Sequence, residues 1–100
     1  MCTATVLPRT DGGFRLGVNR DESRRRAAAR PPMVRPVSGG LRAMMPTDPM
    51  SGGTWAAVND AGLALTLLNV NVRSPWEPTE TMSRGLIIPQ LTDCVAAGEA

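Results

Sequence analysis

The sequence contains no histidine, no lysine and no tyrosine, and its aromatic residues are one phenylalanine and two tryptophans. Without histidine, the chain lacks the imidazole base of Ser-His-Asp and Cys-His sites, the imidazole ligands of many zinc sites and the commonest axial ligand of haem iron. Covalent chemistry in this chain therefore requires a nucleophile that works without histidine.

Long apolar runs are also missing. No stretch approaches the ~18 apolar residues of a membrane span, and the first residues lack the basic and apolar regions of a secretory signal. We therefore expect no membrane span and a cytoplasmic location.

Two cysteines, Cys2 and Cys94, are too few for a disulfide framework. A length of 100 residues fits one small domain, which we expect to cover residues 1–100.

The positive charge is unevenly distributed, with seven of the eleven arginines between residues 20 and 42. Such a block can bind phosphate or nucleic acid. Here alanines and prolines interrupt it, and no aromatic side chains are interleaved to stack on bases. We therefore interpret the block as a solvated loop and expect no nucleic-acid partner.

Cys2 directly follows the initiator methionine and becomes the N-terminal residue once Met1 is removed. One residue then carries both a thiol and a base, because a terminal α-amine with a reference pKa of about 7.7–8.0 can accept the proton of a thiol with a reference pKa of about 8.5. The alternative is a small buried cysteine without chemistry, and its position alone does not decide between the two.

The first twenty residues predict a β-hairpin. Residues 3–7 are rich in β-branched and apolar side chains, residues 10–13 form a turn signal, and residues 14–19 alternate between apolar and polar. Antiparallel pairing brings the start of the first strand to the end of the second. Cys2 should therefore neighbour residues 19–22.

The rest of the chain predicts an α+β fold, an antiparallel sheet with a helix packed on one face. Prolines and glycines exclude a long helix or a central strand over most of residues 23–53. Strands are expected at residues 41–45, 54–58 and 63–72, with a tight turn at residues 59–62. The long apolar run of the last strand is typical of a strand covered on both faces. A helix is expected over residues 84–97, with Pro89 in its interior. Its apolar face would contain Leu86, Ile87, Leu91, Cys94 and Val95.

The string Leu16-Gly17-Val18-Asn19-Arg20-Asp21-Glu22-Ser23 resembles the NRDE protein family, which is also known as transport and Golgi organisation protein 2. Its other matching positions are Met1-Cys2, Ser51-Gly52-Gly53-Thr54-Trp55, Asn69 and Ser83-Arg84-Gly85-Leu86. The resemblance implies a scaffold similar to the N-terminal nucleophile hydrolases, a four-layer αββα sandwich of which this chain would form an incomplete part.

A more distant similarity is to the choloylglycine hydrolases and penicillin V acylases, which also begin Met-Cys-Thr. Their Gly-Arg-Asn-x-Asp pattern matches Gly17, Asn19 and Asp21, and their later strand pattern matches Asn59, Gly62, Leu63, Leu68 and Asn69. The arginine that precedes the asparagine in those enzymes is Val18 here, while Arg20 lies two residues further on. Positions 18 and 20 share one face of a strand.

These resemblances imply an amidohydrolase that cleaves a small C–N amide. Cys2 would attack the carbonyl, its α-amine would carry the proton, and Asp21 would orient the ammonium. Asn69 would donate to the oxyanion, and Arg20 would stabilise the thiolate or pair with a substrate carboxylate. Asn19 completes the catalytic candidates, and the substrate-binding candidates are Glu22, Trp55 and Asn59.

Each of these residues also has a purely structural explanation. Residues 19–22 would form a strand-end turn with surface ion pairs, Asn69 would satisfy backbone groups, and Trp55 would pack in the core. We expect no metal and no cofactor. A family-based alternative is a non-enzymatic role in haem trafficking or in Golgi and secretory function. Haem would then bind through Cys2, through a methionine such as Met44 or Met45, or with no axial ligand.

A further alternative is an inactive, truncated fragment. Members of both families are longer than this chain, so we expect it to be an N-terminal portion. Its sheet edges and pocket would be incomplete, and either a missing C-terminal portion or self-association into a homo-oligomer would cover them.

Overall fold

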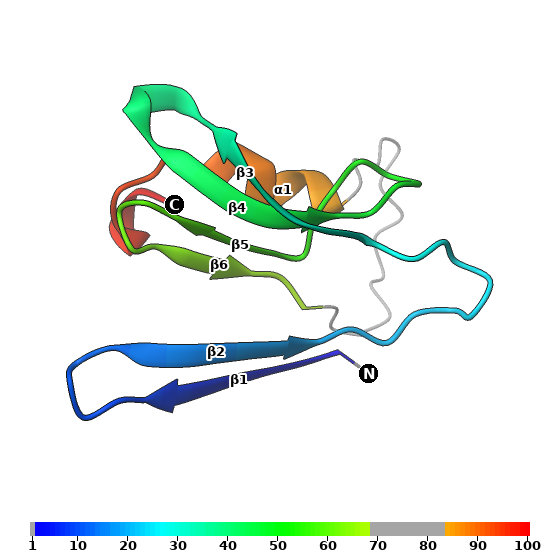
Figure 1. Ribbon diagram of the computed structural model, residues 1–100, viewed down its shortest axis with the longest axis horizontal. Coiled ribbons are helices and arrows are strands. Elements are labelled where there is room, and N and C mark those ends of the chain that lie inside the picture. The colour runs from blue at the N-terminus through cyan, green and yellow to red at the C-terminus, as the bar shows by residue number, and fades with distance from the viewer. Residues whose placement is uncertain (1, 69–83) are drawn as a thin grey trace, which may run out of the picture.

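The strands of the computed structural model, which describes residues 2–68 and 84–100, form two antiparallel sheets (Figure 1). The strands are β1 (Thr3–Pro8), β2 (Phe14–Asn19), β3 (Arg30–Pro36), β4 (Arg42–Thr47), β5 (Ala56–Asn59) and β6 (Ala64–Thr66). One short α-helix, α1 (Ile87–Leu91), and the 3₁₀ helices η1 (Ser38–Gly40), η2 (Arg84–Leu86) and η3 (Ala97–Glu99) complete the described elements. The expected antiparallel sheet with a helix on one face is thus confirmed.

Strands β1 and β2 form the predicted hairpin. Thr3 pairs with Asn19 and Pro8 pairs with Phe14, so the two strands match over their whole length. The turn closes through a 2.7 Å hydrogen bond from the Arg9 amide to the Gly13 carbonyl. This register places Cys2, the residue before β1, beside the end of β2.

The second sheet has the order β3-β4-β5-β6, and α1 packs on one of its faces. Side chains alternate between the two faces of a strand. Ala43, Met45 and Ala57 are therefore buried, and they form the core with Ile88 of α1. Met44 lies between Ala43 and Met45 in sequence, and Val58 follows Ala57. Both side chains point to the opposite face, where each is 42% exposed. The core is small, and the sheet keeps one apolar face uncovered by the described residues.

Strand β3 was not expected, because its seven residues include three prolines. Proline is tolerated at the edge of a sheet, where one side of the strand has no partner. All seven residues are exposed, and the pairing with β4 is interrupted by an irregularity between Arg30 and Met33. The strand expected at residues 41–45 is present as β4, an inner strand of the sheet, whereas the edge strand β3 was missed.

The expected helix over residues 84–97 is wrong in length. The α-helical part spans only Ile87–Leu91. Because the helix begins at Ile87, Pro89 lies in the first turn, where amide hydrogens need no intrahelical acceptor. The expected apolar face is shifted as well: Ile88 is 3% exposed, whereas Ile87 is 38% and Val95 is 55% exposed. No helix within residues 2–68 and 84–100 is long and apolar enough to cross a membrane.

The expected strand at residues 63–72 is shorter in its described part. Strand β6 covers Ala64–Thr66, and residues 69–72 lie outside the described residues. Its position at the end of the sheet order leaves its side chains exposed or half-buried. Among the described residues, the strand in this apolar run is the last of the sheet, and its side chains are not buried on both faces.

Candidate functional site

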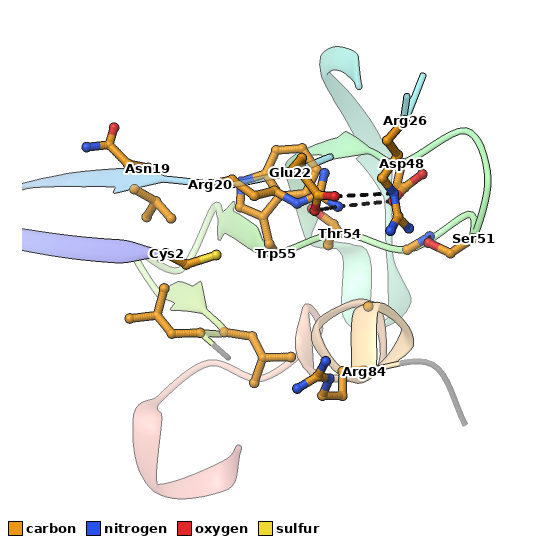
Figure 2. A pocket seen from close by; sticks show the side chains of 15 residues that line it. Cys2, Asn19, Arg20, Glu22, Arg26, Asp48, Ser51, Thr54, Trp55 and Arg84 are labelled. Atoms are coloured by element: carbon orange, nitrogen blue, oxygen red, sulfur yellow. Dashed lines mark hydrogen bonds and ion pairs between the residues drawn. The ribbon is translucent and has the colours of Figure 1, made fainter. Parts of the chain in front are cut away.

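A cleft of about 220 Å³ lies where the open end of the hairpin meets the second sheet (Figure 2). Its walls come from the ends of β1 and β2, the loop between β4 and β5, the residues after β6, and η2. Ligand pockets usually enclose about 300–1,000 Å³. The cleft therefore fits a small molecule or one part of a larger one.

Cys2 and Asn19 enter the cleft because of the hairpin register. Thr3 pairs with Asn19, so the residue before Thr3 lies next to the chain that leaves β2. Cys2 is half-buried and is a free thiol, and its sulfur lies on the cleft side of the strand in Figure 2. The hairpin therefore presents the Cys2 thiol at one end of the cleft, whereas the Asn19 side chain shares the exposed Thr3 face and points away from the thiol in Figure 2.

A network of ion pairs forms the opposite end. Asp48, at the end of β4, accepts hydrogen bonds from Arg20 Nη2 at 3.1 Å and from Arg26 Nε at 2.9 Å. Glu22 forms ion pairs with the same two arginines. Two carboxylates thus engage both guanidinium groups, and the network ties the segment after β2 to the second sheet.

The Asp48 side chain is the most deeply buried member of this network, with 4% of it exposed. The Met50 amide donates a 2.9 Å hydrogen bond to Asp48 Oδ1. This bond, followed by those from Arg20 and Arg26, holds the pKa of Asp48 below its ordinary value, although burial opposes the shift. Asp48 is therefore a stable negative charge that fixes both arginines.

The Trp55 ring packs against the Arg20 guanidinium. The Arg20 guanidinium carbon lies 4.1 Å from the centre of the Trp55 ring, within the range of a cation–π contact. Arg20 is therefore held by Glu22, Asp48 and Trp55 together, and its orientation within the cleft is set by three neighbours.

A close backbone contact between Gly53 and Gly85 holds η2 at the cleft. The Thr54 amide donates a 2.9 Å hydrogen bond to the Gly85 carbonyl, and a Cβ on Gly53 would lie 2.6 Å from that same carbonyl. Only a glycine at position 53 permits this approach. The contact places Arg84, the first residue of η2, on the cleft wall.

Arg84 differs from the other arginines of the cleft. Within residues 2–68 and 84–100, no carboxylate forms an ion pair with it, and its side chain is exposed. Figure 2 shows its guanidinium extending from η2 on the side of the cleft opposite Arg20 and Trp55. Among its described lining residues, the cleft thus has a thiol at one end, a neutralised arginine pair at the other and one unpaired guanidinium, that of Arg84, on its lower wall in Figure 2.

Comparison with known proteins gives one match. The sequence model of the family described as Transport and Golgi organisation 2 matches residues 1–95. The chain belongs to this family. No curated protein and no solved structure matches it. The resemblance drawn from the NRDE string is therefore confirmed, and the match covers nearly the whole chain.

The structure brings together most residues that the sequence proposed for the site of this Transport and Golgi organisation 2 member. The candidates that line the cleft are Cys2, Asn19, Arg20, Glu22 and Trp55. Asp21 does not line the cleft, although it adjoins Arg20 in sequence. Asn69 lies outside the described residues. The hairpin register, which is readable from sequence, accounts for this agreement.

Asn59 lies elsewhere. It ends β5, and its side-chain Nδ2 donates to the carbonyls of Thr92 and Cys94 at 3.1 and 2.7 Å. Its Oδ1 accepts hydrogen bonds from the amides of Ala61 and Leu63. Asn59 therefore closes the β5–β6 turn and ties it to the chain after α1, a structural task away from the cleft.

The candidate haem ligands are not gathered at one place. Met45 is buried in the core and Met44 is on the opposite face of β4, and neither lines the cleft that contains Cys2. No cluster of three His, Cys, Asp or Glu residues suited to a metal occurs in the described part of the chain. Neither methionine therefore shares a site with Cys2, and the haem alternative stays a prediction.

Sequence reasoning missed Asp48 and Arg84. Asp48 lies 28 residues from Arg20 in sequence, and no local pattern signals a pairing over that separation. Arg84 belongs to the Ser83-Arg84-Gly85-Leu86 string that carries the family resemblance, so its presence in a matching motif was a usable signal. Its place at the cleft depends on the Gly53 contact, which only the folded chain shows.

Proposed function

We propose that this family member is an amidohydrolase that cleaves a small C–N amide bond with Cys2 as an N-terminal nucleophile. The position of Cys2 supports this most directly, because the thiol lies in a cleft, half-buried, beside Asn19 and near an array of charged side chains. A small buried cysteine without chemistry would be expected in the core, and Cys2 is not part of it.

The reaction follows from groups that one residue carries after removal of Met1. Cys2 Sγ attacks the amide carbonyl carbon while the α-amine takes the thiol proton. The tetrahedral intermediate then expels the amine, which leaves with that proton, and a thioester remains. Water attacks the thioester, the carboxylic acid leaves and the thiol is restored. No cofactor takes part in these steps.

Stabilisation of the oxyanion needs a hydrogen-bond donor beside the thiol. The Asn19 side chain lies on the Thr3 face of the hairpin, opposite the thiol, so it is not placed to donate there. Removing one such donor typically lowers kcat by about 10²–10³-fold. We therefore keep Asn69 as the proposed donor, and this residue lies outside the described residues.

The proposed scaffold is a part of the αββα sandwich of N-terminal nucleophile hydrolases. In that arrangement each sheet has a helix layer on its outer face and a second sheet on its inner face. Here α1 covers one face of the four-stranded sheet. The other face carries Val34, Met44 and Val58, which are paired neighbours across β3, β4 and β5 and are 42–58% exposed. A second sheet would cover such a row.

The deciding experiment is intact mass spectrometry of the purified full chain, before and after exposure to small acyl p-nitroanilides. We expect loss of Met1, an acyl adduct on Cys2 and release of p-nitroaniline. Cys2→Ala should abolish both the adduct and the release, whereas Cys94→Ala should retain them, because Cys94 lies near the C-terminal end of α1 and does not line the cleft. Retention of Met1, or equal release by Cys2→Ala, would refute the proposal.

A further inference from the structure

The charges of the cleft do not balance. Three arginines and two carboxylates line it, and both carboxylates are engaged by the same two arginines, Arg20 and Arg26. The sequence had suggested Arg20 as the partner of a substrate carboxylate. Since Glu22 and Asp48 already occupy its guanidinium, Arg84 is the arginine of the described cleft lining that no carboxylate pairs with.

Arg84 is held where a ligand can reach it. The Gly53 contact and the hydrogen bond from Thr54 to Gly85 fix the start of η2 against the β4–β5 loop. The guanidinium therefore stands on a wall anchored through the backbone, while its own side chain remains exposed and free of any carboxylate in the described part of the chain. A planar guanidinium presents donors that match an anionic carboxylate in a bidentate manner.

Apolar side chains also line the cleft. Leu67 and Leu68 follow β6, and Val18 comes from β2. Water next to such a surface is displaced favourably by an apolar group of a ligand. The cleft thus offers a cation, an apolar wall and, at the hairpin end, the Cys2 thiol.

We propose that the cleft binds small amides that carry an anionic group, with that group paired to Arg84 and an apolar part against Leu67 and Leu68. That these amides are cleaved rests on the proposed function. That they bind rests only on the geometry of Arg84. The anionic group can belong to the acyl side or to the amine side of the amide. In both cases one small molecule carries the carboxylate for Arg84 and the amide bond for Cys2.

Binding is best measured on the full chain carrying Cys2→Ser, so that cleavage does not interfere. Ligand-observed NMR titrations would use benzoylglycine, with the carboxylate on the amine side, and N-phenylsuccinamic acid, with the carboxylate on the acyl side. Each has a neutral carboxamide counterpart as its reference. We expect one of the two acids to bind about tenfold more tightly than its carboxamide, and the preference to weaken as salt is raised.

Variants of two arginines separate a specific pair from general positive charge. Arg84→Gln should remove the preference for the acid, and Arg84→Lys should keep part of it. Arg15→Gln serves as the matched control, because Arg15 is exposed on β2 and does not line the cleft. Equal binding of acid and carboxamide, or an equal effect of Arg84→Gln and Arg15→Gln, would overturn the inference.

The two proposals fail in different ways. If the acid binds through Arg84 but the chain with intact Cys2 releases no amine, the hydrolase proposal falls and the anion site stands. If acids and carboxamides are cleaved at equal rates by the same chain, the hydrolase stands and the anionic substrate class falls.

Discussion

Gly53 and Gly85 meet through their backbones, and a Cβ at position 53 would lie 2.6 Å from the carbonyl carbon and oxygen of Gly85. Gly53→Ala must therefore push η2 away from the β4–β5 loop or strain the loop itself. We expect a loss of about 1–3 kcal/mol in the free energy of unfolding, the usual cost of overpacking. Urea denaturation followed by circular dichroism would measure it.

Gly17→Ala is the matched control for that substitution. Gly17 lies within β2, where nothing approaches within 4 Å of an added Cβ, and its φ is not positive. Alanine there should be neutral or should stabilise the chain by up to about 1 kcal/mol, because glycine loses more conformational freedom on folding. Equal destabilisation by the two substitutions would contradict the role given to the Gly53 contact.

Asp48→Asn should weaken the network that joins the segment after β2 to the second sheet. The substitution leaves Arg20 and Arg26 without the nearly buried carboxylate that accepts their hydrogen bonds. We expect a loss of about 1–3 kcal/mol. As a control, Asp60→Asn breaks an exposed pair with Arg42 and should cost only about 0–1 kcal/mol.

The contribution of Asp48 depends on pH in a defined direction. Its pKa is lowered in the folded chain by the Met50 amide and the two arginines, so folding favours the ionised form. The stabilisation is complete above the unfolded pKa of about 3.9 and is lost as the pH falls through the lower folded value. The stability gap between the wild type and Asp48→Asn should therefore be constant near neutral pH and should shrink in acid. A gap that widens in acid would contradict this.

Asn59→Ala should reduce stability without changing binding at the cleft. The side chain makes four hydrogen bonds, two to carbonyls after α1 and two from amides of the β5–β6 turn. Their loss should cost about 2–3 kcal/mol, allowing for partial replacement by water. Asn59→Asp keeps the acceptor but places a carboxylate oxygen against the carbonyl oxygens of Thr92 and Cys94, so it should cost at least as much as Asn59→Ala. Unchanged stability with weaker benzoylglycine binding would instead support a substrate-binding role.

The two thiols should differ in their reaction with iodoacetamide. Burial raises the pKa of the Cys94 thiol, and Asp93 and Glu99 add to the shift by repelling the thiolate. Cys94 should therefore react slowly at neutral pH and faster as the pH rises above the ordinary thiol range, since the thiolate is the nucleophile. Peptide mass spectrometry at several pH values would follow each cysteine, and Glu99→Gln should speed the reaction of Cys94. Fast labelling of Cys94 at neutral pH would contradict the shift.

The parts of the fold that depend on local sequence were predictable, and those that depend on distant contacts were not. The hairpin and its register follow from alternation and a turn signal within twenty residues, and they sufficed to bring Cys2 to Asn19. The α1 boundaries were wrong because the sequence shows the presence of Pro89 but not which turn of the helix accommodates it.

The candidate site shows the same division. Cys2, Asn19 and Arg20 are reached through one hairpin, whereas Asp48 becomes part of the cleft only through ion pairs across more than twenty residues. The contact between Gly53 and Gly85 was also not predictable. Glycine-rich loops are common, and the sequence does not show which glycine is required for a close backbone approach. Long-range packing therefore determines which arginines of the cleft are paired with carboxylates and which is left unpaired.

The prolines of β3 also limit how this molecule can polymerise. Neighbouring residues of a strand direct their amide hydrogens to opposite sides, so the pair Pro31-Pro32 removes a donor from the outer edge as well as from the inner one. A strand from another molecule would find a gap in the hydrogen-bond ladder at that edge. The missing donor therefore disfavours fibril-like stacking on the outer edge of β3.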